Sequence, residues 1–180
     1  IESAYEVGSL LGEYLLQLGF NVDFAPVADV FSNENNQVVR YRSFGSDPEL
    51  VSDMAIAVHE GLQDKGVLST FNHFPGHGLT DGDTHAGYAA SSKTLEEIRE
   101  CELKPFIRGV QEGVSFIMAG HISLPNITGD NTPASLSSVL IGEVLRTELG
   151  YDKIVITDAM NMGAIVNSYS SSQAAVLALN

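Results

Sequence analysis

The chain has few cysteines, few basic residues and no tryptophan. Its 180 residues include one cysteine, Cys101, and nine lysines and arginines stand against 23 aspartates and glutamates. A single cysteine excludes a disulfide within the chain and leaves the redox compartment open. The net charge of −14 and the lack of a lysine- or arginine-rich segment argue against nucleic acid or an anionic membrane surface as partners, because both need a basic face.

Long hydrophobic runs, repeats and linkers are missing as well. No apolar run approaches the roughly 18 residues that a membrane-spanning helix needs, so we expect no membrane span. The first three residues show neither the basic start nor the apolar stretch of a signal peptide. What is present is a foldable composition, 44% hydrophobic and 18% charged, which predicts that residues 1–180 form one globular domain or part of one.

Hydrophobic periodicity predicts helices and strands in regular alternation. A first helix is expected to begin with a capping box of Ser3 and Glu6 and to end at Gly19. Its apolar face comprises Val7, Leu10, Leu11, Tyr14, Leu15 and Leu18. Strands are expected over residues 22–30, 67–71, 114–119 and 153–157. Further helices are expected over residues 48–65 (capped by Asp47), 94–110 (capped by Thr94 and Glu97), 137–149 and 172–179.

The predicted strands are continuous apolar runs, which is typical of a parallel sheet covered by helices. Such an α/β pattern fits an open doubly wound sheet or part of a (β/α)8 TIM barrel. Asp29, His73, His121 and Asp158 each follow a predicted strand. In both folds the carboxyl ends of the strands carry the chemistry, so we expect these side chains to gather there.

The segment from residue 72 to residue 85 holds three of the five histidines. Pro75 and the glycines of this segment exclude a regular helix, so His73 and His77 stand on a loop. Such histidines either hydrogen-bond neighbouring carbonyl groups or take part in a site.

Asp83, His85 and Asp158 are the strongest candidates for chemistry. Asp83 and His85 are two residues apart, which in an extended segment places both on one side. A carboxylate partner fixes the tautomer of an imidazole and raises its pKa toward the range of a general acid/base, although such pairs also occur for structural reasons. Asp158 at a strand end can be a nucleophile, a metal ligand, a general base or the cap of a following turn. Arg42 can clamp a substrate hydroxyl or carboxylate, or lie on the surface.

Six segments resemble, in order and spacing, the motifs of the family 3 glycoside hydrolases, and within that family those of the bacterial β-N-acetylhexosaminidases. They are residues 21–30, 42–48, 73–78, 83–85, 133–137 and 156–158. The resemblance implies a (β/α)8 barrel, of which this chain would supply about four parallel strands with their covering helices, acting on terminal β-linked N-acetylglucosamine with retention. It implies the following roles: Asp158 as nucleophile, His85 as acid/base, Asp83 as its paired carboxylate, and Arg42, Asn72 and His73 as sugar-binding residues. It implies neither a metal nor an organic cofactor.

The sequence departs from the family pattern in two positions and in length. Asn72 stands where most relatives have a lysine that binds a sugar hydroxyl, and Leu79 stands where aspartate is common. Because the family barrel has eight strands, we expect this chain to be a fragment whose missing strands carry an acidic sugar-binding residue and which is inactive alone. The expected partners are an N-acetylglucosamine-containing glycoside or peptidoglycan fragment, and the remainder of the barrel or a second copy of the chain. The resemblance also favours a bacterial protein that is secreted or held at the cell envelope.

Two other functions remain open at this point. One is a metal-dependent hydrolase in which His73, His77, His85 and an aspartate bind zinc or a similar ion. The other is a carbohydrate-binding or scaffolding relative without turnover, which the substitution at Asn72 suggests.

Overall fold

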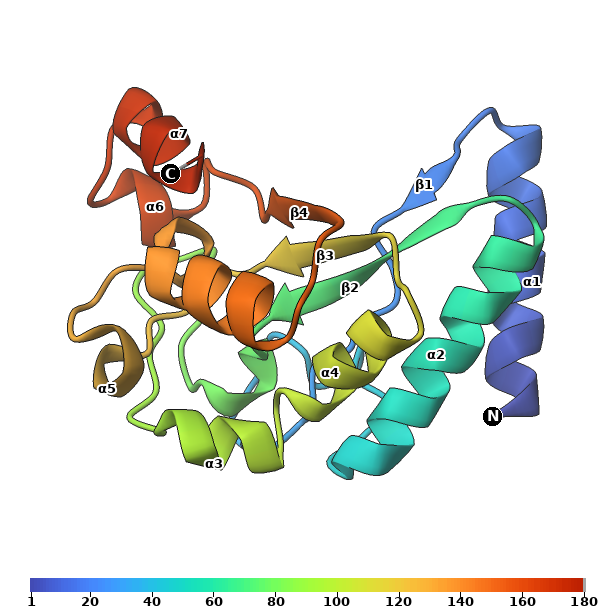
Figure 1. Cartoon of the computed structure of the whole chain (residues 1–180), viewed down its shortest axis with the longest axis horizontal. Coiled ribbons are helices and arrows are strands. Elements are labelled where there is room, and N and C mark those ends of the chain that lie inside the picture. The colour runs from blue at the N-terminus through green and yellow to red at the C-terminus, as the bar shows by residue number, and fades with distance from the viewer. Residues whose placement is uncertain (180) are drawn as a thin grey trace.

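A computed structural model describes residues 1–179 as an α/β fold built on four parallel strands (Figure 1). The strands are β1 (Val22–Asp23), β2 (Leu68–Phe74), β3 (Phe116–Ala119) and β4 (Ile154–Thr157), and each pairs with the next along the chain. This is the strand order of successive βα units in a TIM barrel. The predicted class, four parallel strands with covering helices, is confirmed.

Helices separate the strands. They are α1 (Glu2–Gln17), α2 (Pro48–Asp64), α3 (Leu95–Glu100), α4 (Lys104–Gln111), α5 (Pro125–Thr128), the π-helix η3 (Val139–Glu148), α6 (Gly163–Val166) and α7 (Ser171–Leu179), with single 3-10 turns η1 (His77–Leu79) and η2 (Ala134–Leu136). In Figure 1, α2, α3 and α4 lie on one side of the sheet and α1 runs beside α2. No helix within residues 1–179 combines the length and the apolar character needed to cross a membrane.

The first strand is shorter than the predicted 22–30, although the chain stays beside β2 beyond it. The Thr70 amide donates to the Ala25 carbonyl at 2.9 Å, and the Ala28 amide donates to the Asn72 carbonyl at 2.7 Å. Pro26 lies between these bonds and has no N–H to donate, so the regular ladder is interrupted there. The irregular pairing still delivers residue 29 to the carboxyl end of the sheet.

The single helix predicted over residues 94–110 is wrong, because two helices, α3 and α4, occupy this stretch. Thr94 and Glu97 do form the predicted capping box at the start of α3. The break follows from Pro105, which has no N–H to donate and whose ring would clash with the carbonyl four residues back, that of Cys101, in a continuous helix.

The capping box predicted for the first helix is also wrong. The helix begins directly after Ile1, no side chain caps it, and Ser3 lies inside its first turn. The residue after a helix C-cap often adopts the left-handed conformation, and Gly19 does so as predicted, with φ of 86°.

The predicted apolar face of α1 is not the face that packs on α2. That contact is made by the small buried residues Ala4, Gly8 and Gly12. A Cβ atom on Gly8 would lie 2.4 Å from the carbonyl oxygen of Val58, so the helix backbones approach at a distance that only glycine allows. Apolar side chains remain on the surface as a result, with Leu10 54% exposed. The other exposed members of the stripe are Val7, Leu11, Tyr14 and Leu18.

The main core lies between the sheet and its helices and fixes the carboxyl end of β2. Phe71 and Phe74 of this strand are fully buried, and the Phe74 ring meets that of Phe106 edge to face with centroids 5.6 Å apart. Such aromatic burial contributes several kcal/mol and leaves little freedom in the strand. His73, between the two phenylalanines, is therefore held in a fixed place.

Candidate active site

The residues predicted to gather at the carboxyl ends of the strands do so. His73 is the penultimate residue of β2, His121 follows β3 by two residues and Asp158 directly follows β4. The Asp158 amide donates to the carbonyl of Ala119, the last residue of β3, at 2.9 Å. The negative charge of Asp158 also reaches the imidazoles of His77 and His121, where it raises the pKa of each and offsets part of the effect of burial.

The Asp29 carboxylate bonds to two of the histidines in this cluster. Its carboxylate is fully buried and contacts the His73 Nδ1 atom at 2.7 Å. The same carboxylate accepts the backbone N–H groups of His73 at 3.1 Å and of His77 at 2.6 Å. Burial alone would raise the pKa of Asp29, but these contacts outweigh it and hold the pKa below its ordinary value. Asp29 is therefore an anion that joins the first two strands of the sheet.

His77 supports the loop that follows it. Its Nε2 atom lies 3.0 Å from the Thr84 hydroxyl and its Nδ1 atom lies 3.2 Å from the Thr80 hydroxyl. Burial lowers the pKa of His77, and the attraction of Asp29 offsets only part of that shift. A neutral imidazole with one donor and one acceptor nitrogen suits two hydroxyl partners, so His77 has a structural task.

Asp83 and His85 form the pair expected from their spacing. The His85 Nδ1 atom lies 2.7 Å from Asp83 Oδ1, which also accepts the His85 amide at 2.9 Å. Partial burial would raise the pKa of Asp83, but the hydrogen bonds and charge of His85 lower it below its ordinary value. The His85 side chain is 64% exposed. With Nδ1 occupied by the carboxylate, the Nε2 atom is the one free to exchange a proton with a substrate.

The loop that carries this pair is fastened to the segment that follows β4. The Gly163 amide donates to the His85 carbonyl and the Ala164 amide donates to the Thr84 carbonyl, both at 3.0 Å. A Cβ atom on Gly163 would lie 2.6 Å from the Ala86 carbonyl carbon and 2.8 Å from the His85 carbonyl oxygen. Only glycine at position 163 allows this approach, which ties the Asp83–His85 loop to the chain just beyond Asp158.

Asp158 itself is half-buried at the mouth of β4. Its Oδ1 atom accepts the Ala159 amide at 2.7 Å, and the helix that follows begins only at Gly163, with Met162 as its N-cap. Asp158 therefore shapes a turn but does not cap a helix. Beside it, His121 donates from Nε2 to the Ala159 carbonyl at 3.1 Å, while burial lowers its pKa and keeps it neutral.

Arg42 and Asn72 stand in different settings. The Arg42 side chain is exposed and makes no hydrogen bond or ion pair with residues 1–179. Its neighbour Ser43 donates to the Asp29 carbonyl at 2.7 Å, which places this loop at the same end of the sheet. Asn72 is buried, donates from Nδ2 to the Phe24 carbonyl at 2.6 Å, and has no partner for Oδ1.

Each histidine of the 73–85 segment has a hydrogen-bond partner within the protein. His73 is paired with Asp29, His77 with two threonines and His85 with Asp83. Across the described part of the chain, residues 1–179, no three histidine, cysteine, aspartate or glutamate side chains converge so that they could hold a metal ion.

Candidate catalytic groups that lie at the carboxyl ends of parallel strands and on the loops that follow them are typical of enzymes built on an α/β barrel. The chain belongs to family 3 of the glycosyl hydrolases, because the model of that family's N terminal domain matches residues 1–180.

Individual relatives agree with this assignment. A β-hexosaminidase of Hydrogenovibrio crunogenus is 35% identical over 91% of this chain and 45% of its own length. β-Hexosaminidase LpqI of Mycobacterium tuberculosis is 38% identical over 93% of this chain and 44% of its own length. The solved structure of a family 3 β-N-acetylglucosaminidase from Paenibacillus sp. str. FPU-7 superposes with a TM-score of 0.96 at 39% identity, over 98% of this chain and 34% of that one. The chain thus spans less than half the length of each.

Several residues of the site were missed as functional by reasoning from the sequence. Asp29 and His121 were expected only to lie near the strand ends, and Gly163 was not considered. A glycine shortly after the candidate nucleophile was the one available signal for a close backbone approach.

Proposed function

We propose that this chain carries the catalytic groups of a retaining glycoside hydrolase that removes terminal β-linked N-acetylglucosamine. The observation that carries the proposal is the 2.7 Å Asp83–His85 pair on a loop that Gly163 and Ala164 bond to the segment following Asp158. Its support is the family membership, together with relatives named β-hexosaminidase and β-N-acetylglucosaminidase. The Asp83–His85 pair and Asp158 supply the proton donor and the nucleophile that such a reaction needs.

In the first step, a carboxylate oxygen of Asp158 attacks the anomeric carbon and forms a glycosyl ester. The bond to the leaving oxygen breaks as protonated His85 gives that oxygen the proton from Nε2. Asp83 holds Nδ1–H and stabilises the imidazolium before the transfer. In the second step, neutral His85 takes a proton from water, which attacks the anomeric carbon and frees Asp158.

The sugar would be held by Arg42, His73 and Asn72. Arg42 has all its donors free, and the His73 ring is oriented by Asp29. At Asn72 the sugar would meet a neutral amide in place of the lysine of the family pattern. The Asn72 amide nitrogen gives one hydrogen bond to the Phe24 carbonyl, and its Oδ1 atom, which has no partner in the described chain, would accept a hydroxyl hydrogen.

The test is Asp158→Asn in the full-length protein, assayed with a chromogenic β-N-acetylglucosaminide. An amide is nearly isosteric with the carboxylate but cannot form the ester, so turnover should be abolished while the circular dichroism spectrum and the melting temperature stay unchanged. Undiminished turnover would remove Asp158 from the mechanism.

We also propose that residues 1–180 are one part of a single catalytic barrel domain. Parallel sheets close in barrels without free edges, whereas β1 and β4 each have one neighbour in the described sheet. The exposed apolar stripe of α1, including Leu10 and Tyr14, supports a covering partner, either the remainder of the barrel or a second copy of the chain.

Sedimentation velocity and a chromogenic assay on the 180-residue chain test this second proposal. We expect self-association and very low hexosaminidase turnover, because a partial barrel lacks part of the sugar site. A well-behaved monomer with full activity would overturn it.

A further inference from the structure

A pocket of about 540 Å³ lies beside the loop that carries His85. Three segments enclose it: Tyr88 from that loop, residues 121–133 beyond β3, and residues 163–169 from the start of α6 onward. The candidate catalytic residues Asp83, His85 and Asp158 do not line it. The pocket has the volume of a site for a small ligand and shares only His121 with the cluster described above.

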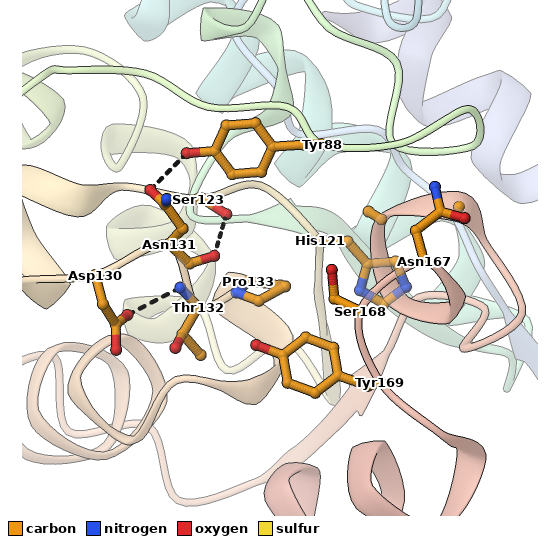
Figure 2. Close-up of a pocket in the computed structure, with 12 residues that line it drawn as sticks. Tyr88, His121, Ser123, Asp130, Asn131, Thr132, Pro133, Asn167, Ser168 and Tyr169 are labelled. Atoms are coloured by element: carbon orange, nitrogen blue, oxygen red, sulfur yellow. Dashed lines mark hydrogen bonds between the residues drawn. The ribbon is translucent and has the colours of Figure 1, made fainter.

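Two aromatic side chains line the pocket on different sides. Figure 2 shows Tyr88 and Tyr169 on opposite sides of the pocket, with Pro133 between them. The Tyr88 hydroxyl donates to Asn131 Oδ1 at 2.7 Å, which holds its ring across the opening. Flat apolar surfaces with polar tips suit a ligand that has a C–H face and hydroxyl edges.

Some polar groups of the pocket have no partner in the described part of the protein. Within residues 1–179, the side chains of Asn167 and Ser168 make no hydrogen bond, and Asn131 uses its oxygen but not its amide nitrogen. The Asp130 carboxylate accepts the Thr132 amide through Oδ1 at 2.9 Å. Donors and acceptors without partners in the described chain therefore lie around the pocket.

We propose that this pocket is a second saccharide site that binds a neutral N-acetylglucosamine unit between Tyr88 and Tyr169. The identity of the sugar rests on the proposed function, whereas the place of the site rests on the pocket itself. The sugar would stack on the tyrosines and exchange hydrogen bonds with Asn131, Asn167 and Asp130.

The charges of the pocket favour a neutral sugar over a carboxylated one. The hydrogen bonds from Thr132 lower the pKa of Asp130, so this group is an anion at neutral pH. Burial lowers the pKa of His121, so that ring is uncharged. No lysine or arginine of the described chain lines the pocket. A sugar carboxylate would meet Asp130 without a compensating cation.

The pocket shares its walls with the acid/base loop. Tyr88 follows His85 by three residues, and Gly163 and Ala164, which line the pocket, hold the His85 and Thr84 carbonyls. The bound saccharide has two possible sources: the part of the substrate beyond the scissile bond, or a separate glycan strand. Both present the same chemistry to the pocket.

Calorimetric titration of the chain with the β-1,4-linked trisaccharide of N-acetylglucosamine tests the site. We expect Tyr88→Ala and Asn167→Ala each to raise the dissociation constant of the trisaccharide about tenfold or more. Each variant removes a side chain that the sugar would contact. Tyr14→Ala is the matched control, because Tyr14 and Tyr88 are both 59% exposed and Tyr14 lies on α1. Asn21→Ala, at an exposed asparagine before β1, is the control for Asn167.

Arg42→Ala separates this proposal from the proposed function. If Arg42→Ala and the pocket variants all weaken the trisaccharide, one glycan spans both sites. If only the pocket variants weaken it, a separate glycan occupies the pocket. Either result supports the site, and the second does so even if the proposed hydrolysis fails. Loss in Arg42→Ala alone, or affinity unchanged in Tyr88→Ala and Asn167→Ala, would overturn it. Equal affinity for N-acetylmuramic acid and N-acetylglucosamine would overturn the neutral preference.

Discussion

Two carboxylate–imidazole pairs in this molecule have the same geometry and opposite surroundings. Asp29 and His73 lie 2.7 Å apart with side chains 0% and 7% exposed, whereas Asp83 and His85 lie 2.7 Å apart with side chains 51% and 64% exposed. The buried carboxylate has three hydrogen-bond donors around it, all from the protein. The exposed pair leaves His85 Nε2 free to meet a substrate.

The difference shows that distance alone does not identify an acid/base pair. A buried pair whose carboxylate accepts several hydrogen bonds orients other groups and resists change, because disrupting it leaves a buried charge without a partner or solvent. An exposed pair costs little to disturb and is open to proton exchange. The following substitutions break or sharpen this contrast.

The largest effect is expected for His85→Ala in the full-length protein. Loss of a general acid should slow glycosides with poor leaving groups by about 10²–10⁴-fold and activated aryl glycosides far less, since their departure needs little proton help. Asp83→Ala should act in the same direction more weakly. Steady-state kinetics across a leaving-group series measure this, and equal losses across the series would contradict the assignment.

Next in size is Asp29→Ala, which should lower the free energy of unfolding by about 3–5 kcal/mol, because it leaves the buried partners of the carboxylate unpaired. Asp83→Ala should cost less than about 1 kcal/mol, as exposed pairs do. Urea denaturation of the two variants side by side makes the comparison directly. Similar losses in both would show that burial does not separate the pairs.

Gly163→Ala should cost about 1–3 kcal/mol, because the added methyl group meets the backbone of residues 85 and 86. It should also lower kcat by displacing the His85 loop. The control is Gly142→Ala, where a Cβ atom meets nothing within 4 Å and the helical position favours alanine. The urea midpoint should fall for Gly163→Ala and not for Gly142→Ala. A fall in both variants or in neither would contradict the role of Gly163 in holding the His85 loop.

The smallest effect is on acid stability. His77 and His121 have pKa values lowered by burial, so the unfolded chain binds more protons below its histidine pKa of about 6.5. Stability should therefore fall as the pH drops from 7.5 to 5.5, by at most about 1.4 kcal/mol per group and pH unit. Asp29 adds a later loss, below its unfolded value of about 3.9. A flat urea midpoint between pH 7.5 and 5.5 would contradict the neutral state of these histidines.

The strands and the candidate catalytic residues could be predicted from the sequence, because they depend on local signals. An apolar run followed by Asp158 marks a strand end, and the two-residue spacing of Asp83 and His85 suffices to bring them together. The family resemblance added their proposed roles.

What could not be predicted depends on contacts between distant segments. The packing of α1 rests on the backbone of Gly8 against that of Val58, and an apolar stripe elsewhere on the helix indicated the wrong face. The role of Asp29 depends on donors 44 and 48 residues away. The sugar-binding roles of Asn72 and Arg42 stay predictions, because the positions of these side chains are compatible with the roles but do not test them.

The sequence separation within each pair determines whether that pair can be transferred to another protein as a single segment. Asp83 and His85 are two residues apart, so a graft of residues 80–88 would bring the complete acid/base pair into another barrel that offers the same backbone anchors. Asp29 reaches its partners only when two strands from distant parts of the chain are already paired, and each contact closes a loop of more than 40 residues. The proton-transfer pair can therefore be transplanted as one short segment, whereas the contacts of Asp29 form only in a protein that contains the paired strands.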